Sequence, residues 1–283
     1  MSALKAESQT TNLPAAVEPP LAPRAVLLFD IDGVIRDVGG SYRRAIVETV
    51  HHYSGERPDP AAIDALKAEG CWNNDWEASL ELLRRGGLDA LPAFDALVDV
   101  FNGYYFGGDP NGDPSAWQGF IGSEPLLVDR AFFTDLSAAG VAWGFVSGAE
   151  PPSARFVLEA RLGLNNPPLI AMGDAPDKPD PTGFLRLAAE ILGVQQKQAA
   201  VPVAYLGDTV ADVITVQRAR QQQPHQTFLS LAVAPPHLHA PEASDRRSHY
   251  EAQLLEAGAD VVIPSTSAVL NALDEVIAAS SQR

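Results

Sequence analysis

The chain has 283 residues, of which 46% are hydrophobic and 20% are charged. These proportions are typical of a globular protein with a sizeable core and exclude a collagen, a coiled coil or a wholly disordered chain. Twenty Lys and Arg against 36 Asp and Glu give a net charge of −16, which argues against a nucleic-acid or anionic-membrane surface. The single cysteine excludes an intrachain disulfide, and no apolar run approaches the roughly 18 residues of a membrane span.

Residues 1–24 are predicted to form a flexible tail. They are small and polar, include four prolines, and show no periodic apolar pattern. They also lack the basic-then-apolar layout of a secretory signal, so we expect a cytoplasmic protein.

Beyond the tail, short apolar runs alternate with helical patterns. Six runs are predicted strands: residues 25–29, 141–146, 168–171, 202–206, 228–233 and 260–263. Apolar residues at helical spacing occupy residues 153–162, 183–192, 211–222 and 267–277. This alternation predicts an α/β fold, with a Rossmann-like parallel sheet covered by helices on both faces.

Residues 39–125 interrupt that alternation. Four helical patterns follow one another there with no convincing strand between them, over residues 42–53, 60–67, 75–84 and 91–105. Because this segment lies between the first and second strands, we predict an all-helical cap inserted into an α/β core of residues 25–38 and 126–283. Residues 235–253 are unusually long and polar for a connection, and a lid, a partner-binding loop or a simple insertion all remain open.

The predicted strand ends carry polar side chains, and open α/β sheets place their active sites at the carboxyl ends of their strands. The residues concerned are Asp30 and Asp32 after the first strand, Ser147 and Gly148 after the second, Lys178 ahead of the helix at 183–192, and Asp208 and Asp212 after the fourth. We therefore expect these groups to face one crevice.

Four carboxylates in one crevice cannot all be ionised without a cation, and ligands that are all oxygen suit Mg²⁺. A carboxylate in line with a metal-bound phosphoryl group can attack it, while a neighbouring carboxyl group suits acid and base work. A hydroxyl, a lysine ammonium and loop amides would stabilise the phosphoryl oxygens. The residue types thus indicate phosphoryl transfer.

The motifs Asp30-x-Asp32-Gly33, Ser147-Gly148, Lys178-Pro179-x-Pro181 and Gly207-Asp208-x-x-x-Asp212 together resemble the four motifs of the haloacid dehalogenase-like hydrolase superfamily. Order, strand context and intervals agree from residue 25 to about residue 277. The helical insert resembles the cap of the phosphoglycolate phosphatase and β-phosphoglucomutase branch, which closes over the substrate. The second motif departs from the frequent Thr-Asn, and Glu150-Pro151-Pro152 follows where an arginine often occurs.

The resemblance implies a role for each motif residue. Asp30 would be the nucleophile, and Asp32 the acid that protonates the leaving oxygen and later activates water. Ser147 and Lys178 would bind the transferring phosphoryl group, with Gly148 in the same substrate-binding loop. Mg²⁺ would be held by Asp30, the backbone carbonyl of Asp32 and Asp208, with Asp212 as a ligand or a support.

The implied activity is a Mg²⁺-dependent phosphatase that hydrolyses a small phosphorylated metabolite through an aspartyl-phosphate intermediate. Asp32 favours phosphoryl transfer over dehalogenation, because dehalogenating members of the family generally lack the second aspartate and the metal site. Two alternatives remain open: a phosphosugar mutase, and a catalytically quiet member that binds a phospholigand or a protein. Neither a nucleic acid nor a membrane is expected as a partner, and the oligomeric state is left open.

Three cap residues are candidate substrate contacts. Arg43, at the start of the first cap helix, could make a bidentate contact to a second anionic group. Asn73 and Asn74 lie in a segment that corresponds to the specificity loop of similar caps. A solvated helix face for Arg43 and a helix N-cap for Asn74 are the structural alternatives.

Overall fold

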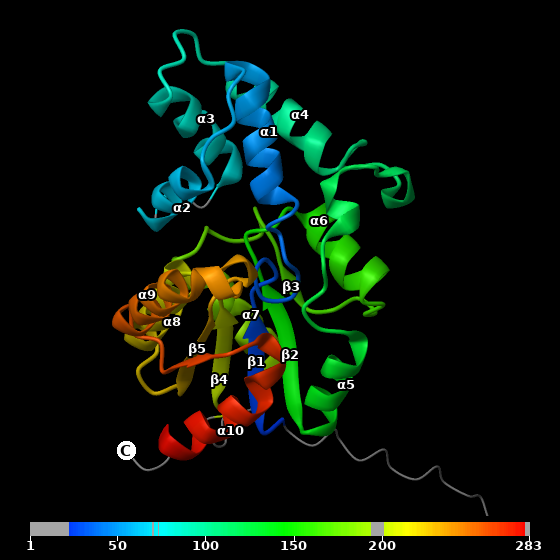
Figure 1. Cartoon of the computed structure of the whole chain (residues 1–283). Helices are drawn as coiled ribbons and strands as arrows, with labels where there is room; N and C mark the ends of the chain where they lie inside the picture. Colours follow the sequence, from blue (N-terminus) through cyan, green and yellow to red (C-terminus); the bar gives the residue numbers. More distant parts are fainter. Residues whose placement is uncertain (1–22, 70, 73, 194–200, 281–283) are drawn as a thin grey trace, which may run out of the picture.

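A computed structural model describes residues 23–69, 71–72, 74–193 and 201–280 (Figure 1). It confirms the predicted Rossmann-like α/β fold, with one parallel sheet in the order β3-β2-β1-β4-β5-β6. The strands are β1 (Ala25–Phe29), β2 (Val141–Val146), β3 (Leu169–Ile170), β4 (Val203–Gly207), β5 (Phe228–Val233) and β6 (Val261–Ile263). Residues 1–22 of the predicted tail lie outside the described residues, whereas Arg24 already pairs with Asp274 of the core at 2.5 Å.

Helices cover both faces of the sheet. Leu27 and Phe29 of β1 point to the face covered by α5 (Arg130–Ala138), α6 (Pro151–Arg155) and α10 (Val269–Ser280). Val26 and Leu28 point to the opposite face, covered by α7 (Thr182–Leu192) and α8 (Val210–Gln222). Because every residue of β1 is buried, its sequence is a continuous apolar run, as expected for a central parallel strand.

Two core helices, α5 and α9 (Ser244–Glu256), were absent from the sequence prediction. Helix α9 occupies much of the polar segment 235–253, and it packs through Leu254 against Val213 and Ala232. Since its sequence has no wide apolar stripe, periodicity could not reveal it. The helix expected over residues 153–162 begins earlier, at Pro151, and continues as a π-helical turn over Phe156–Arg161.

The inserted segment forms a helical lobe beyond the carboxyl ends of the strands (Figure 1). Its helices are α1 (Tyr42–Ser54), α2 (Pro60–Ala68), α3 (Asp75–Arg85) and α4 (Phe94–Tyr105), followed by short 3₁₀ turns at Pro114–Ala116 and Phe120–Ser123. The lobe has an apolar cluster of its own, which includes Tyr42, Ile46, Phe101 and Tyr105. None of the helices in the described part of the chain has the length and apolar character needed to cross a membrane.

Two chain segments join this lobe to the core, and they run side by side. Asp37 donates its backbone N–H to the carbonyl of Pro125 (2.8 Å), and Leu127 donates to the carbonyl of Ile35 (2.9 Å). The outgoing segment begins directly after Asp30 and Asp32. The connection between lobe and core is therefore built next to the predicted reactive groups.

Candidate active site

The ends of β1 and β4 bring predicted site residues together with Lys178. Asp30 follows β1, is buried, and donates its backbone N–H to the carbonyl of Leu206 in β4 (2.9 Å). The Lys178 Nζ atom lies 3.1 Å from Asp30 Oδ2 and 2.6 Å from Asp212 Oδ1. Groups that are far apart in the sequence thus meet at one edge of the sheet, as predicted from the strand ends.

Three buried carboxylates form the acidic centre of this edge. One oxygen each from Asp30, Asp208 and Asp212 lies within 4.8 Å of the others. Burial raises the pKa of Asp30 to about 6, with Asp212 and Asp32 acting in the same direction and Lys178 opposing them. Burial and the nearby Asp30 also raise the pKa of Asp208. One lysine therefore does not balance the cluster, and an oxygen-only set with excess negative charge fits Mg²⁺.

Asp212 is the most heavily bonded of the three carboxylates. Its Oδ1 atom accepts from Lys178 (2.6 Å) and from the Tyr205 hydroxyl (3.2 Å). Its Oδ2 atom accepts from the backbone N–H (2.9 Å) and hydroxyl (2.6 Å) of Thr209, forming a capping box at the start of α8. Because its two oxygens accept four hydrogen bonds, Asp212 is better suited to hold Lys178 in place than to coordinate an ion. Asp30 has fewer contacts, one from the Ile31 N–H (2.8 Å) and one from Lys178, and the Asp208 side chain accepts no hydrogen bond from the described residues, so these two carboxylates are better able to hold an ion.

Two glycines allow the loops to approach these carboxylates. Gly33 has a φ of +75°, and a Cβ atom there would lie 2.0 Å from Asp208 Oδ2. A Cβ atom at Gly207 would lie 2.3 Å from Asp212 Cβ. Any side chain at either position would displace a carboxylate of the acidic centre, which explains the glycine in each motif.

Ser147 and Gly148 follow β2 on the same side of the site. Ser147 is buried, its hydroxyl acts to lower the pKa of Asp30, and its oxygen accepts from the Ala149 N–H (3.2 Å). Gly148 is exposed, and a Cβ atom there would meet nothing within 4 Å. This loop therefore presents a hydroxyl beside the carboxylate of Asp30 and open backbone next to it.

The Asp32 side chain is held outside the acidic centre, by a residue that sequence reasoning missed. Arg36 donates from Nε to Asp32 Oδ1 (2.6 Å) and from Nη1 to Glu124 Oε2 (2.9 Å). The signal for Arg36 was a lone cation after the apolar pair Val34 and Ile35. Tyr205 was also missed, because a tyrosine inside a buried strand looks like any other apolar residue.

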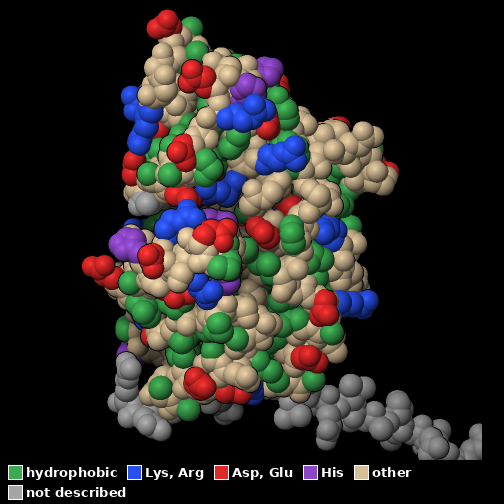
Figure 2. Space-filling view, viewed as in Figure 1, with side chains coloured by type: hydrophobic (Ala, Val, Ile, Leu, Met, Phe, Trp, Pro, Cys, Tyr) green, Lys and Arg blue, Asp and Glu red, His purple; other side chains and the backbone are tan. Residues whose placement is uncertain are grey.

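Arg43 lies where the helical lobe faces the core. It pairs with Asp64 of α2 at 2.8 Å, and Asp64 also lies 3.6 Å from both His237 and Arg246 of the core. Burial and Arg43 hold the pKa of His237 below its usual value, against the opposing effect of Asp64. Figure 2 shows basic, acidic and histidine side chains gathered at this boundary between the lobes.

Asn74 is the N-cap of α3, which is the structural alternative considered for it above. Its side-chain oxygen caps α3 by accepting from the N–H groups of Trp76 (2.9 Å) and Glu77 (3.2 Å). The side-chain amide N–H₂ is not used by this cap. Asn73 lies outside the described residues.

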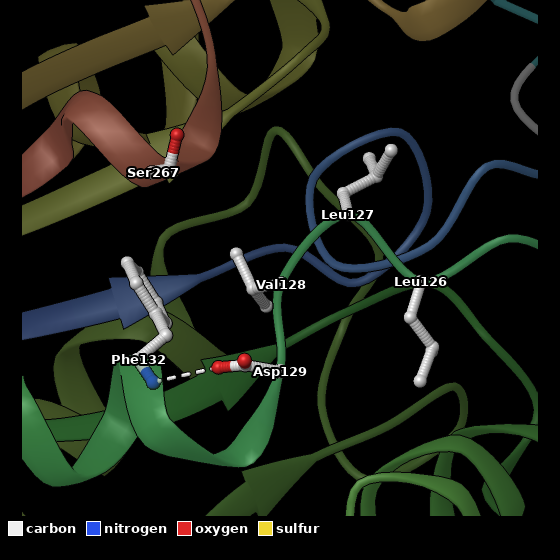
Figure 3. Close-up of a pocket in the computed structure, with 6 residues that line it drawn as sticks. All are labelled: Leu126, Leu127, Val128, Asp129, Phe132 and Ser267. Carbon is white, nitrogen blue, oxygen red and sulfur yellow. Dashed lines mark hydrogen bonds between the residues drawn. The ribbon is translucent and has the colours of Figure 1, made fainter.

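A separate pocket of about 420 Å³ lies beside the segment that returns from the cap (Figure 3). The carboxylate of Asp129 accepts from the Phe132 N–H at 3.0 Å and so caps α5. None of the predicted site residues lines this pocket, so it is distinct from the candidate active site at the strand ends. The lining residues are Leu126, Leu127, Val128, Asp129, Phe132 and Ser267.

One curated relative shares part of its sequence with this chain. It is named imidazoleglycerol-phosphate dehydratase, from Phytophthora nicotianae, and is 31% identical over 202 residues. The matched region is 70% of this chain but only 42% of that protein, so the chain spans less than half of the relative's length.

Solved structures with the same fold include two phosphatases and a related hydrolase. A phosphonoacetaldehyde hydrolase-like protein from Oleispira antarctica superposes with a TM-score of 0.63 and 17% identity, covering 94% of this chain and 96% of that one. A predicted phosphoglycolate phosphatase from Haemophilus somnus gives 0.61 and 13%, covering 90% and 100%. A phosphatase from Thermococcus thioreducens gives 0.55 and 20%, covering 81% and 99%.

The sequence itself matches a family model over most of its length. Residues 25–220, which contain all four motifs, match the model described as haloacid dehalogenase-like hydrolase. The match begins with β1 and runs through the cap into α8. The chain therefore belongs to the haloacid dehalogenase-like hydrolases.

Proposed function

We propose that this protein is a Mg²⁺-dependent phosphatase that hydrolyses a small phosphorylated metabolite through an aspartyl phosphate on Asp30. The observation that carries the proposal is the contact of Lys178 with Asp30 (3.1 Å), within reach of the carboxylates of Asp208 and Asp212. A buried carboxylate beside an ammonium and an oxygen-only cation site suits attack on a phosphate ester. A large net negative charge and the enclosed position of Asp30 favour a small ligand over a nucleic acid or a membrane.

The proposed reaction has two displacements at phosphorus. In the first, an Asp30 oxygen forms a bond to phosphorus, the phosphorus–ester oxygen bond breaks, and the departing oxygen takes the proton of Asp32. In the second, a water oxygen attacks phosphorus, Asp32 takes its proton, and the phosphorus–Asp30 bond breaks to release inorganic phosphate.

Each remaining group has a task in both displacements. Lys178 and the Ser147 hydroxyl would bind the phosphoryl oxygens, and Asp212 would hold Lys178 in place. Asp30, Asp208 and the backbone carbonyl of Asp32 would hold the ion. When bound, Mg²⁺ supplies positive charge that allows the carboxylates and the phosphate to approach each other.

The cap boundary offers a contact for a second anionic group of the substrate. Arg43 and Arg246 both approach the carboxylate of Asp64 there, and these three charges act on His237 together with Asp37. An anionic group of the substrate that entered between Arg43 and Arg246 would replace part of the negative charge that Asp64 now provides. We therefore propose Arg43 as a specificity residue, with Asn74 as a second candidate through its side-chain amide N–H₂ group, which takes no part in the cap.

Asp30→Asn should lower turnover of 4-nitrophenyl phosphate in Mg²⁺ by more than about 1000-fold, because the amide is a poor nucleophile. Asp245→Asn, at an exposed aspartate of α9, is the matched control and should retain full activity. Turnover is measured as release of inorganic phosphate, and product analysis on a sugar phosphate separates hydrolysis from isomerisation. Undiminished turnover by Asp30→Asn would exclude Asp30 as the nucleophile.

The acidic centre predicts a pH-dependent stability that Mg²⁺ reverses. The pKa of Asp30 is raised to about 6 from 3.8, so its contribution to stability is complete below pH 3.8 and is lost as pH rises through 6. In EDTA, we expect the melting temperature of wild type to fall between pH 5 and pH 7.5 by more than that of Asp30→Asn. Mg²⁺ should raise the wild-type melting temperature at pH 7.5 and have much less effect on the variant. Equal melting curves of the two proteins, with and without Mg²⁺, would contradict a shared cation site.

Arg43→Gln should change the ranking of substrates. We expect kcat/KM for phosphoglycolate, which carries a second anionic group, to fall about tenfold relative to glycerol 3-phosphate, as for the loss of one charge-assisted hydrogen bond. Arg57→Gln removes a cap arginine that pairs with Glu48 at 2.9 Å and serves as the control. An unchanged ratio between the two substrates would assign Arg43 to structure alone.

Substitutions at Asn74 separate capping from recognition. Asn74→Ala removes the cap of α3 and should cost about 1 kcal/mol of stability, whereas Asn74→Asp keeps a capping oxygen and should not lower the melting temperature. If the Asn74 amide contacts substrate, Asn74→Asp still alters relative kcat/KM values across a panel of phosphate esters. Proportional effects on every ester would leave Asn74 with its capping role only.

A further inference from the structure

Arg36 is the largest side chain that the described residues bury completely. Each nitrogen of its guanidinium group has a hydrogen-bond acceptor: Asp32 Oδ1 for Nε (2.6 Å), Glu124 Oε2 for Nη1 (2.9 Å) and Ser153 Oγ for Nη2 (2.8 Å). The cation therefore has a fixed orientation. It lies between Asp32, which takes part in the proposed reaction, and Glu124 and Ser153, which do not.

Stability alone does not account for a buried arginine at this position. Moving charges out of water is costly, and apolar residues of similar volume often stabilise a protein at least as well as a buried ion pair does. Aromatic rings also contact this group, with Tyr42 stacked on Tyr105 at 4.1 Å and the Arg36 guanidinium 5.4 Å from the Tyr42 ring. Apolar side chains in place of both Arg36 and Glu124 would avoid the cost of burying these charges, so the pair points to a requirement on geometry.

That geometry concerns the carboxylate of Asp32. Its Oδ1 atom accepts from Arg36, while its Oδ2 atom accepts no hydrogen bond from the residues that the structure describes. The Asp32 side chain keeps 28% of its surface exposed, whereas that of Arg36 has none. The contact thus fixes one oxygen and leaves the other free to exchange a proton.

The other side of Arg36 is held by the base of the cap. Glu124 lies on the returning segment, is buried, and accepts from the Ser41 hydroxyl (2.5 Å) and the Tyr105 hydroxyl (3.2 Å) through its Oε1 atom. Ser41 immediately precedes α1, and Tyr105 is the last residue of α4. Arg36 is therefore anchored to the first and last helices of the cap at the place where the two connecting segments pair.

We propose that Arg36 is a positioning residue that orients Asp32 for proton transfer, with Glu124 as its anchor. The proposal rests on the proposed phosphatase function, in which Asp32 gives a proton to the leaving oxygen. Arg36 touches neither the substrate nor the reacting atoms and acts only through the orientation of the Asp32 carboxylate. The same contacts join the proton donor to the segments that carry the cap.

The test uses two phosphate esters that differ in their need for a proton. The leaving group of 4-nitrophenyl phosphate departs readily without one, whereas the alkoxide of glycerol 3-phosphate requires one. Arg36→Met should lower kcat/KM for glycerol 3-phosphate about tenfold more than for 4-nitrophenyl phosphate, a part of the effect expected for general acid catalysis. Arg36→Lys should give a smaller difference, and the control Arg155→Met, at an exposed arginine of α6 that pairs with Glu159, should give none.

A double-mutant cycle shows whether Arg36 acts through Asp32. In an Asp32→Asn background, Arg36→Met should leave the ratio of the two kcat/KM values unchanged. If Arg36→Met misfolds, Glu124→Gln, which keeps Arg36 but removes the charge of its anchor, should still shift the ratio in wild type and not in Asp32→Asn. Equal losses on both esters, or a further shift in the Asp32→Asn background, would overturn the proposal. Wild type that hydrolyses neither ester would instead contradict the proposed function itself.

Discussion

The buried carboxylates of Asp30, Asp208 and Asp212, with Lys178 as their one close cation among the described residues, are the constraint on which the site depends. Like charges this close in a buried place repel one another, and burial, reinforced by the charges of Asp212 and Asp32, raises the pKa of Asp30. A structure selected for stability alone would not gather them. Their proximity is explained if a bound cation offsets the negative charges of these carboxylates and of a phosphate.

The parallel sheet places these carboxylates close together. Parallel strands end at one edge of the sheet, so β1 and β4 deliver their aspartates to the same place without long loops. Gly33 and Gly207 then allow the backbone to pass within contact distance of Asp208 and Asp212. Capping of α8 by Thr209 and Asp212 fixes the direction in which Asp212 meets Lys178. Rigid elements thus hold most of the site, whereas Asp32 is held by the connection to the cap.

Much of the fold could be predicted from the sequence, because buried parallel strands are continuous apolar runs. The ends of β1, β2 and β5 agree with the prediction to the residue, and the motif residues after β1 and β4 lie together as expected. Helix α9 could not be predicted, since Leu254 is its buried residue and its apolar spacing is weak. The link from Asp32 to Glu124 was hidden for another reason: it passes through Arg36, which lies 88 positions from Glu124, and no periodic pattern reports such a contact.

The central claim is that Asp30 accepts the phosphoryl group while the acidic centre holds a divalent cation. It is tested most directly by acid-quenching the protein during turnover and locating phosphate on its peptides by mass spectrometry. The account predicts an acid-stable, base-labile phosphate on Asp30 in the presence of Mg²⁺, and none when EDTA replaces the ion. Steady turnover with no phosphate on Asp30, or with phosphate on another residue, would contradict it.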